Sequence, residues 1–169
     1  VFDIVPDYDL DIMGEANSLT DTTVRVLSRL NALFDDFLPD LVIVHGDTTT
    51  TFSAALAAFN KTIPIAHIEA GLRTFDMTSP FPEEFNRQAV GLMANYHFAP
   101  TTTAAKNLTK CNIDDDKVIV TGNTVIDALF WMSKKIQSEK DLQRCIDADI
   151  ENIVRFDFKK ERYILVTAH

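Results

Sequence analysis

The feature that most constrains the fold of this chain is a set of short, unbroken runs of apolar, mostly β-branched residues. We expect strands at these runs, which occupy residues 41–44, 64–68, 96–99, 117–121 and 162–167. Because the runs lack polar–apolar alternation, they indicate strands covered on both faces, as in parallel sheets. Segments with apolar residues at helical spacing separate them. This alternation predicts right-handed βαβ units, and therefore an α/β fold with a doubly wound parallel sheet and helices on both faces.

The organisation of the chain indicates one main domain and a connector. At 169 residues the chain is long enough for one good hydrophobic core and short for two. The apolar period fades over residues 138–160, so we place an N-terminal domain at 1–137 and a connector with the last strand at 138–169. The first residue is not Met, and the sequence stops on the last predicted strand. We therefore expect a fragment of a longer protein.

Charge and composition narrow the classes of function. The formal net charge of −9, with no local basic stripe, argues against binding to nucleic acid or to an anionic membrane surface. No apolar run approaches the roughly 20 residues that cross a bilayer. The two cysteines, Cys111 and Cys145, form no Cys-x-x-Cys pattern and no disulfide framework. These observations favour a reducing compartment, and we expect a cytoplasmic protein.

The first candidate site residue is Asp47, which follows the predicted strand 41–44. In open parallel sheets, ligands bind at the carboxyl ends of the strands. Gly46 lets the chain turn there, and a run of four threonines follows Asp47 at an expected helix start. Four β-branched residues start a helix poorly, which hints at a functional role. The alternative is that Asp47 serves only as the N-cap of that helix.

Two further carboxylates lie in similar positions. Glu69 follows the strand 64–68, and Arg73 comes four residues later, so the pair is either part of a site or a surface ion pair. Glu83 lies at an expected helix start, where a carboxylate can simply favour the helix dipole. Glu84 and Arg87 are spaced to pair along the same helix.

The histidines and glycines exclude several kinds of chemistry. His-x-Asp and His-x-Glu occur at 45/47 and 67/69, but no third cluster of ligands supports a metal site, so we expect none. His45 and His67 lie within apolar strands and are interpreted as core or supporting residues. Neither a Gly-x-Gly-x-x-Gly loop nor a Walker P-loop is present, so dinucleotide binding and ATP hydrolysis lack support.

Four segments, in this order and spacing, resemble a single family. They read His-Gly-Asp-Thr-Thr-Thr-Thr at 45–51, His-Ile-Glu-Ala-Gly-Leu-Arg-Thr at 67–74, Ser-Pro-Phe-Pro-Glu-Glu-Phe-Asn-Arg at 79–87 and Thr-Gly-Asn-Thr-Val-Ile-Asp-Ala at 121–128. Together they closely resemble the non-hydrolysing bacterial UDP-N-acetylglucosamine 2-epimerases. The tail, Val-Thr-Ala-His at 166–169, is similar to the start of that family's Val-Thr-Gly/Ala-His-Arg segment.

The resemblance implies a fold and a reaction. The family has two Rossmann-like domains with the ligand between them, and this chain matches most of the first. The opening strand with its Gly-Thr-Arg-Pro-Glu segment, and the second domain with its Ser-Gly-Gly segment, lie outside the sequence. The family interconverts UDP-GlcNAc and UDP-ManNAc, for cell-surface polysaccharide precursors, by eliminating UDP to give 2-acetamidoglucal and adding it back. No cofactor is needed.

The resemblance also implies roles for individual residues. Asp47, Glu69, Glu83 and His169 match the catalytic positions, and Arg73 joins Asp47, Glu69 and His169 in substrate binding. The expected ligands are UDP-GlcNAc and UDP, and the expected assembly is a homodimer. Two alternatives remain open: a related enzyme that hydrolyses UDP-GlcNAc to ManNAc and UDP, and a folded fragment without activity.

Overall fold

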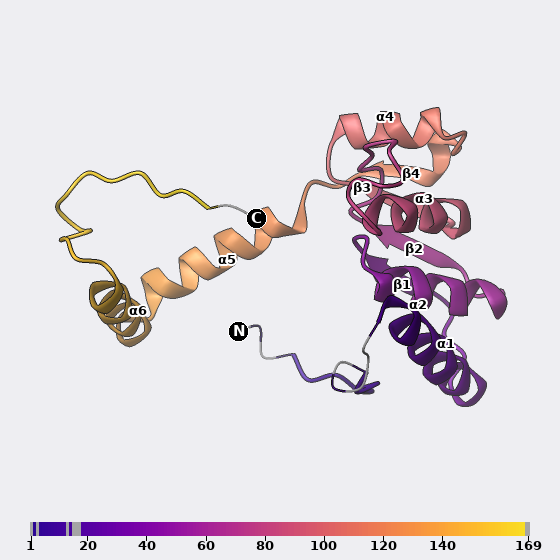
Figure 1. The fold of residues 1–169 in the computed structure, drawn as a ribbon, viewed down its shortest axis with the longest axis horizontal. Coiled ribbons are helices and arrows are strands. Elements are labelled where there is room, and N and C mark those ends of the chain that lie inside the picture. The colour runs from indigo at the N-terminus through magenta and orange to yellow at the C-terminus, as the bar shows by residue number, and fades with distance from the viewer. Residues whose placement is uncertain (1, 3, 13, 15–17, 168–169) are drawn as a thin grey trace. The chain divides into compact units, whose positions relative to one another are not determined.

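The computed structural model describes residues 2, 4–12, 14 and 18–167. The chain divides into two compact units, Val1–Thr124 and Val125–His169, which are described separately (Figure 1). The predicted boundary after residue 137 falls near the end of a helix, and the domain assignment stays a prediction. Among the described residues, no helix is long and apolar enough to span a membrane.

The first unit is built on a four-stranded parallel sheet. Its strands are β1 (Val42–His45), β2 (Ile65–Ile68), β3 (Tyr96–Ala99) and β4 (Val118–Val120), in the spatial order β1-β2-β3-β4. In this register Val44 pairs with His67, His67 with His97, and His97 with Val118. The predicted parallel α/β fold is confirmed, with each of these strands within about one residue of its predicted range.

Helices connect these strands, and local sequence explains where they begin. They are α1 (Leu19–Asp36), α2 (Thr49–Asn60), α3 (Glu83–Met93), α4 (Thr102–Lys110) and the short 3₁₀ helix η1 (Asp115–Lys117). The hydroxyls of Ser18, Thr48 and Thr101 accept hydrogen bonds from backbone N–H groups in the first turns of α1, α2 and α4. These caps satisfy N–H groups that the helix itself leaves free.

The core of the first unit lies between the sheet and helices α1 to α4. One cluster packs α1, α2 and α3 on the sheet through Phe34, Val44, Ala55, Ala57, Ala58, Ile63, Ile65 and Val90. A second cluster packs α4 through Ala70, Ala99, Ala104 and Leu108. The sheet residues in both clusters lie on one face of the sheet, as the register of the strands and the alternation of side chains along each strand require. On that opposite face Ile43, Tyr96 and Ile119 remain about half exposed.

The second unit contains α5 (Thr124–Ser138, whose first residue belongs to the first unit) and α6 (Lys140–Ile153). The strand predicted at 162–167 is wrong: this segment has no regular secondary structure, and Ile164, Leu165 and Val166 are largely exposed. A strand is held by hydrogen bonds to a neighbouring strand. Among the described residues of this unit there is no strand that could supply them.

Candidate functional site

Asp47 lies in the turn between β1 and α2, and it is not the cap of α2. The cap is Thr48, whose Oγ1 accepts a hydrogen bond from the N–H of Thr51. The Asp47 carboxylate instead reaches α3, where its Oδ2 lies 2.8 Å from Nε and 2.7 Å from Nη2 of Arg87. The Asn86 side chain donates to the backbone carbonyl of Asp47 at 2.8 Å. The capping interpretation is therefore wrong, and the Asp47 carboxylate forms an ion pair with Arg87.

Arg87 continues to a second carboxylate, Glu84, at 3.4 Å, so the pairing predicted along α3 is present. The Glu84 side chain is fully buried, and it accepts hydrogen bonds from the N–H groups of Thr74 and Phe75 and from the Gln88 amide. Burial alone would raise the pKa of Glu84, but these hydrogen bonds outweigh it and hold the pKa below its ordinary value. Glu84 is therefore ionised at neutral pH, and it holds the backbone of Thr74 and Phe75.

Glu69 follows the last residue of β2 and has a left-handed backbone conformation, with φ of 66°. Such a backbone is uncommon for a residue with a side chain and tends to mark functional positions. Its Oε2 lies 3.4 Å from Nε2 of His45, at the end of the neighbouring strand. The Thr124 hydroxyl lies 3.4 Å from the same histidine nitrogen. Glu69 thus pairs with His45, and the ion pair considered with Arg73 is absent among the described residues.

The strand histidines separate by the face they occupy. His67 is 1% exposed, and its Nε2 donates to the Gly46 carbonyl at 2.8 Å, as expected of a core histidine. The side chain of His45 is 53% exposed, so the core interpretation of this residue is wrong. Strand residues alternate between faces, and the register places His45 beside Ile68 rather than His67. His45 therefore belongs to the open carboxyl edge of the sheet.

The remaining predicted site residues lie elsewhere or outside the description. Arg73 lines a cavity of about 250 Å³ together with Gln88, Gly91, Leu92, Cys111 and Ile113. Its Nη1 donates to the carbonyl of Leu72, and its buried Nε has no hydrogen-bond partner in the described part of the chain. Glu83 is the first residue of α3, beside the buried Glu84. His169 lies outside the described residues. The roles assigned to these residues stay predictions.

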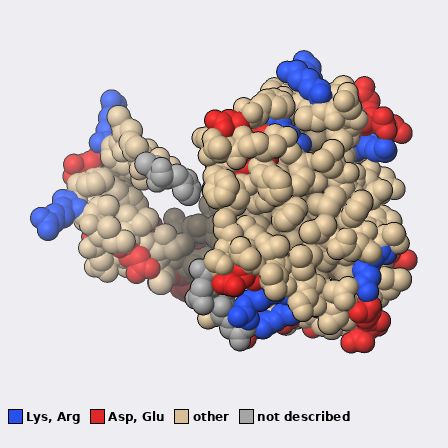
Figure 2. All heavy atoms as spheres, turned by 45° about the vertical axis from the view of Figure 1, so that its right-hand side comes forward, with Lys and Arg blue, Asp and Glu red and all other residues tan. Residues whose placement is uncertain are grey.

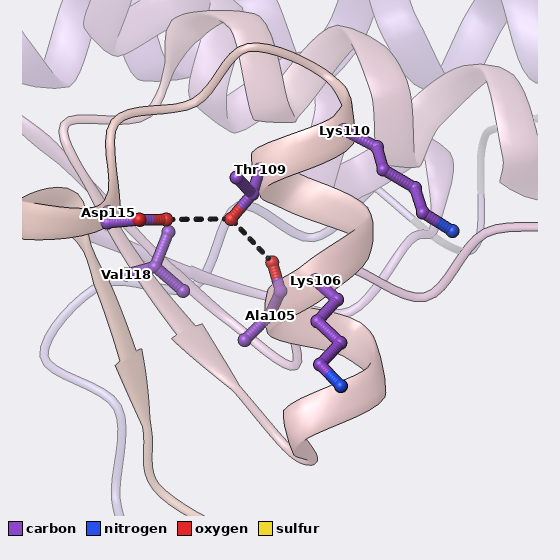
Figure 3. A pocket seen from close by; sticks show the side chains of 6 residues that line it. All are labelled: Ala105, Lys106, Thr109, Lys110, Asp115 and Val118. Carbon is purple, nitrogen blue, oxygen red and sulfur yellow. Dashed lines mark hydrogen bonds between the residues drawn. The ribbon is translucent and has the colours of Figure 1, made fainter.

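A larger hollow lies beside α4, and none of the carboxylates Asp47, Glu69 and Glu84 lines it. Its volume is about 650 Å³, and it is lined by Ala105, Lys106, Thr109, Lys110, Asp115 and Val118. In Figure 3 the side chains of Lys106 and Lys110 extend away from Asp115, whose carboxylate accepts a hydrogen bond from Thr109 at 2.8 Å. Thr109 and Asp115 thus bond to each other, and we interpret the hollow as a surface feature.

The comparisons with known proteins agree with the motif segments. A family model described as UDP-N-acetylglucosamine 2-epimerase matches residues 1–169. The chain belongs to the UDP-N-acetylglucosamine 2-epimerase family. It is 48% identical over 169 residues to the UDP-N-acetylglucosamine 2-epimerase of Yersinia pestis, and 47% identical to that of Escherichia coli K12. Both alignments cover all of this chain but 44% of the relative, so the chain spans less than half the length of these relatives.

Solved epimerase structures match the fold as well. The crystal structure of UDP-GlcNAc 2-epimerase from Neisseria meningitidis bound to UDP-GlcNAc aligns with a TM-score of 0.81 and 47% identity, over 90% of this chain and 41% of that one. The crystal structure of the Methanocaldococcus jannaschii UDP-GlcNAc 2-epimerase in complex with UDP-GlcNAc and UDP aligns with a TM-score of 0.79 and 34% identity. That alignment covers 86% of this chain and 39% of the other. The sheet and helices described above therefore correspond to part of a two-domain epimerase.

Within this epimerase fold, sequence reasoning missed the partners of the acidic residues. Arg87 lies 40 residues from Asp47 along the chain, so no local pattern relates them. His45 was interpreted as a core or supporting residue without a named partner, although strand alternation places it on the face opposite Val44. The arrangement can hold one carboxylate against a guanidinium and present a second one beside an exposed imidazole.

Proposed function

We propose that this chain supplies the proton-transfer side of the active site of a UDP-GlcNAc 2-epimerase that interconverts UDP-GlcNAc and UDP-ManNAc. The observation that carries the proposal is the position of Asp47 and Glu69 in the turns that follow β1 and β2. The last residues of these strands, His45 and Ile68, pair in register. Ligands of open parallel sheets bind at this edge. Family membership supplies the substrate class.

The proposed reaction begins with an elimination. A base removes the proton from C2 of the sugar, the C1–O bond breaks, and UDP leaves with the electron pair, giving 2-acetamidoglucal. An acid then protonates C2 from the opposite face, and the UDP oxygen adds back to C1. The C2 proton is only weakly acidic, so catalysis needs positioned proton-transfer groups on both faces of the ring. The net result of the elimination and the re-addition is inversion of configuration at C2, and the reaction uses neither an oxidant nor a cofactor.

In this proposal Asp47 and Glu69 contact the sugar, and Glu83 is a further acid or base. The exposed fractions of the Asp47 and Glu69 side chains, both 26%, are compatible with access by a ligand. His169 acts near the diphosphate, and Arg73 contributes to substrate binding. The second domain of the family supplies most of the nucleotide site, so the complete activity belongs to the whole protein.

We also propose a cytoplasmic homodimer that makes precursors of cell-surface polysaccharides. What supports a dimer is a set of exposed apolar side chains on the packed helices α2 and α3, which includes Phe59, Phe85 and Leu92. Figure 2 shows that the face of the first unit in this view is mostly uncharged, with acidic and basic groups gathered near its edges. Such a surface suits contact with another protein surface.

The test is product analysis with the protein made from the complete reading frame that encodes these residues. Incubation with UDP-GlcNAc, followed by ¹H NMR, should show UDP-ManNAc appearing while the nucleotide remains linked to sugar. Free ManNAc as the first product would replace this proposal with the hydrolysing reaction. No turnover at all, with folded protein, would leave a binding or structural role and contradict the proposed activity.

A further inference from the structure

The two carboxylate oxygens of Asp47 have different surroundings. Oδ2 receives both contacts from Arg87, at 2.8 Å from Nε and 2.7 Å from Nη2. Oδ1 accepts no hydrogen bond from any described residue. A carboxylate oxygen of a partly exposed side chain that lacks a protein partner is open to a ligand. Asp47 is thus tied at one oxygen and open at the other.

Arg87 is itself held in place from beneath. Its side chain is 16% exposed and lies against the fully buried Glu84. Glu84 is bound in turn by Gln88, one turn further along α3, and by the N–H groups of Thr74 and Phe75 after β2. The guanidinium therefore has carboxylates at two of its edges, and little freedom to rotate. Planar guanidinium groups suit such fixed, directional pairing better than ammonium groups do.

The backbone of Asp47 is fixed by the same helix. Asn86, the residue before Arg87, is 2% exposed and donates from Nδ2 to the Asp47 carbonyl at 2.8 Å. Consecutive residues of α3 thus hold the main chain and the carboxylate of Asp47. A shift of α3, or loss of one of these contacts, changes the direction in which Oδ1 points.

We propose that Arg87 is a positioning residue, held by Glu84, that fixes Oδ2 of Asp47 so that Oδ1 faces the substrate. This inference rests on the proposed function, because the proposed function supplies the sugar that Oδ1 of Asp47 contacts. The guanidinium moves no proton in this scheme. Its effect is to keep the reacting oxygen within hydrogen-bond reach of the sugar, where small displacements are costly.

A purely structural role for Arg87 predicts different behaviour. If the contact only fastened α3 to the β1–α2 turn, its loss would lower stability, and added guanidinium would restore nothing specific to turnover. A positioning role predicts lower kcat with nearly unchanged KM, partial recovery with lysine, and recovery of an alanine variant by a small guanidinium ion. These readouts separate the two roles.

The kinetic experiment uses the protein from the complete reading frame. Arg87→Met should lower kcat about 100-fold, while KM for UDP-GlcNAc stays nearly constant. Arg87→Lys should recover part of the loss, and methylguanidinium should restore activity to Arg87→Ala but not to Asp47→Asn. The matched control is Arg144→Met, which breaks an exposed arginine–aspartate pair with Asp141 in the second unit and should leave kcat unchanged. Unchanged kcat in folded Arg87→Met overturns the proposal.

A second measurement does not depend on turnover. In the 169-residue chain, NMR should detect a scalar coupling across the hydrogen bond from ¹⁵Nε of Arg87 to ¹³Cγ of Asp47, and Glu84→Gln should weaken it. Absence of the coupling in the folded chain overturns the positioning role. If the unchanged protein lacks epimerase activity, the proposed function fails, and the coupling still shows whether Arg87 holds the Asp47 carboxylate in the folded chain.

Discussion

His67 and His97 are partners in register on the neighbouring strands β2 and β3, and both are buried on the helix-covered face of the sheet. Nδ1 of His67 and both ring nitrogens of His97 lack hydrogen-bond partners among the described residues. Burial, together with the charge that a protonated His67 would carry, lowers the pKa of His97 to about 4. Burial also lowers the pKa of His67, and the bond to the Gly46 carbonyl only partly opposes this.

This pair predicts that the first unit loses stability in mild acid. An unfolded histidine has a pKa of about 6.5, so between that pH and about 4 the unfolded state binds more protons than the folded state. The contribution of His97 is fully present above about pH 6.5, falls as pH decreases through this window, and amounts to about 3 kcal/mol. Urea unfolding from pH 7.5 to 4 measures it.

His97→Leu provides the control for this titration. The variant should show a smaller decrease in the free energy of unfolding between pH 6.5 and 4, because one titrating group is gone. The buried Glu84, whose pKa lies below its ordinary value, adds its own loss at lower pH, where carboxylates take up protons. An identical pH dependence in His97→Leu would contradict the assignment.

The hydroxyl cap of α2 can be tested by a pair of threonine substitutions. Thr48→Ala removes the oxygen that accepts from the Thr51 N–H and should lower the free energy of unfolding by about 1 kcal/mol. Thr50→Ala, at an exposed position in the first turn of the same helix, should instead raise it by roughly 0.5 kcal/mol, because alanine favours helix more than threonine does. Equal effects in urea unfolding would refute the cap.

Gly71 is required by a close approach of backbone as well as by its φ of +90°. A Cβ there would lie 2.2 Å from the carbonyl oxygen of Ala104, so Gly71→Ala should destabilise the chain by at least about 3 kcal/mol. Gly122 has a similar φ of +87° with open space around it, so Gly122→Ala should cost only about 1–2 kcal/mol. Matching losses in thermal or urea unfolding would show that α4 does not press on residue 71.

The sequence predicted the elements of the first unit well because their signals are local. The run at 96–99 depends on a few neighbouring residues, and the structure has a strand there as expected. The apolar run at 162–167 carries the same local signal but forms no strand. Strand formation needs a partner strand, and composition cannot supply that information.

The candidate site was predictable only in part, for the same reason. The carboxyl edge of a parallel sheet is a general location for ligands, so Asp47 and Glu69 were found from topology. Their partners were not, because Arg87 reaches Asp47 from another helix, and His45 reaches Glu69 across the β1–β2 ladder. Spacing along the chain left an ion pair with Arg73 as one interpretation of Glu69, and the structure pairs Glu69 with His45 instead.

An elimination mechanism predicts exchange with solvent at C2. In D₂O, each molecule of UDP-ManNAc should carry deuterium at C2, because the proton returned to that carbon comes from a side chain in exchange with water. Loss of the C2 proton signal in ¹H NMR, with a mass increase in the product, is the measurement. Complete retention of the original hydrogen would contradict proton transfer by two solvent-exchanging groups on opposite faces of the ring.

The central claim is that the carboxylates following β1 and β2 perform the chemistry, and turnover of two amide variants tests it most directly. In the protein from the complete reading frame, Asp47→Asn and Glu69→Gln should each lower kcat for UDP-GlcNAc by at least about 100-fold. Each variant replaces a carboxylate that can transfer a proton with an amide of nearly the same shape that cannot. Asp36→Asn and Glu139→Gln, at exposed positions on α1 and beside α6, are the matched controls. Turnover of Asp47→Asn and Glu69→Gln equal to that of the controls would contradict the claim.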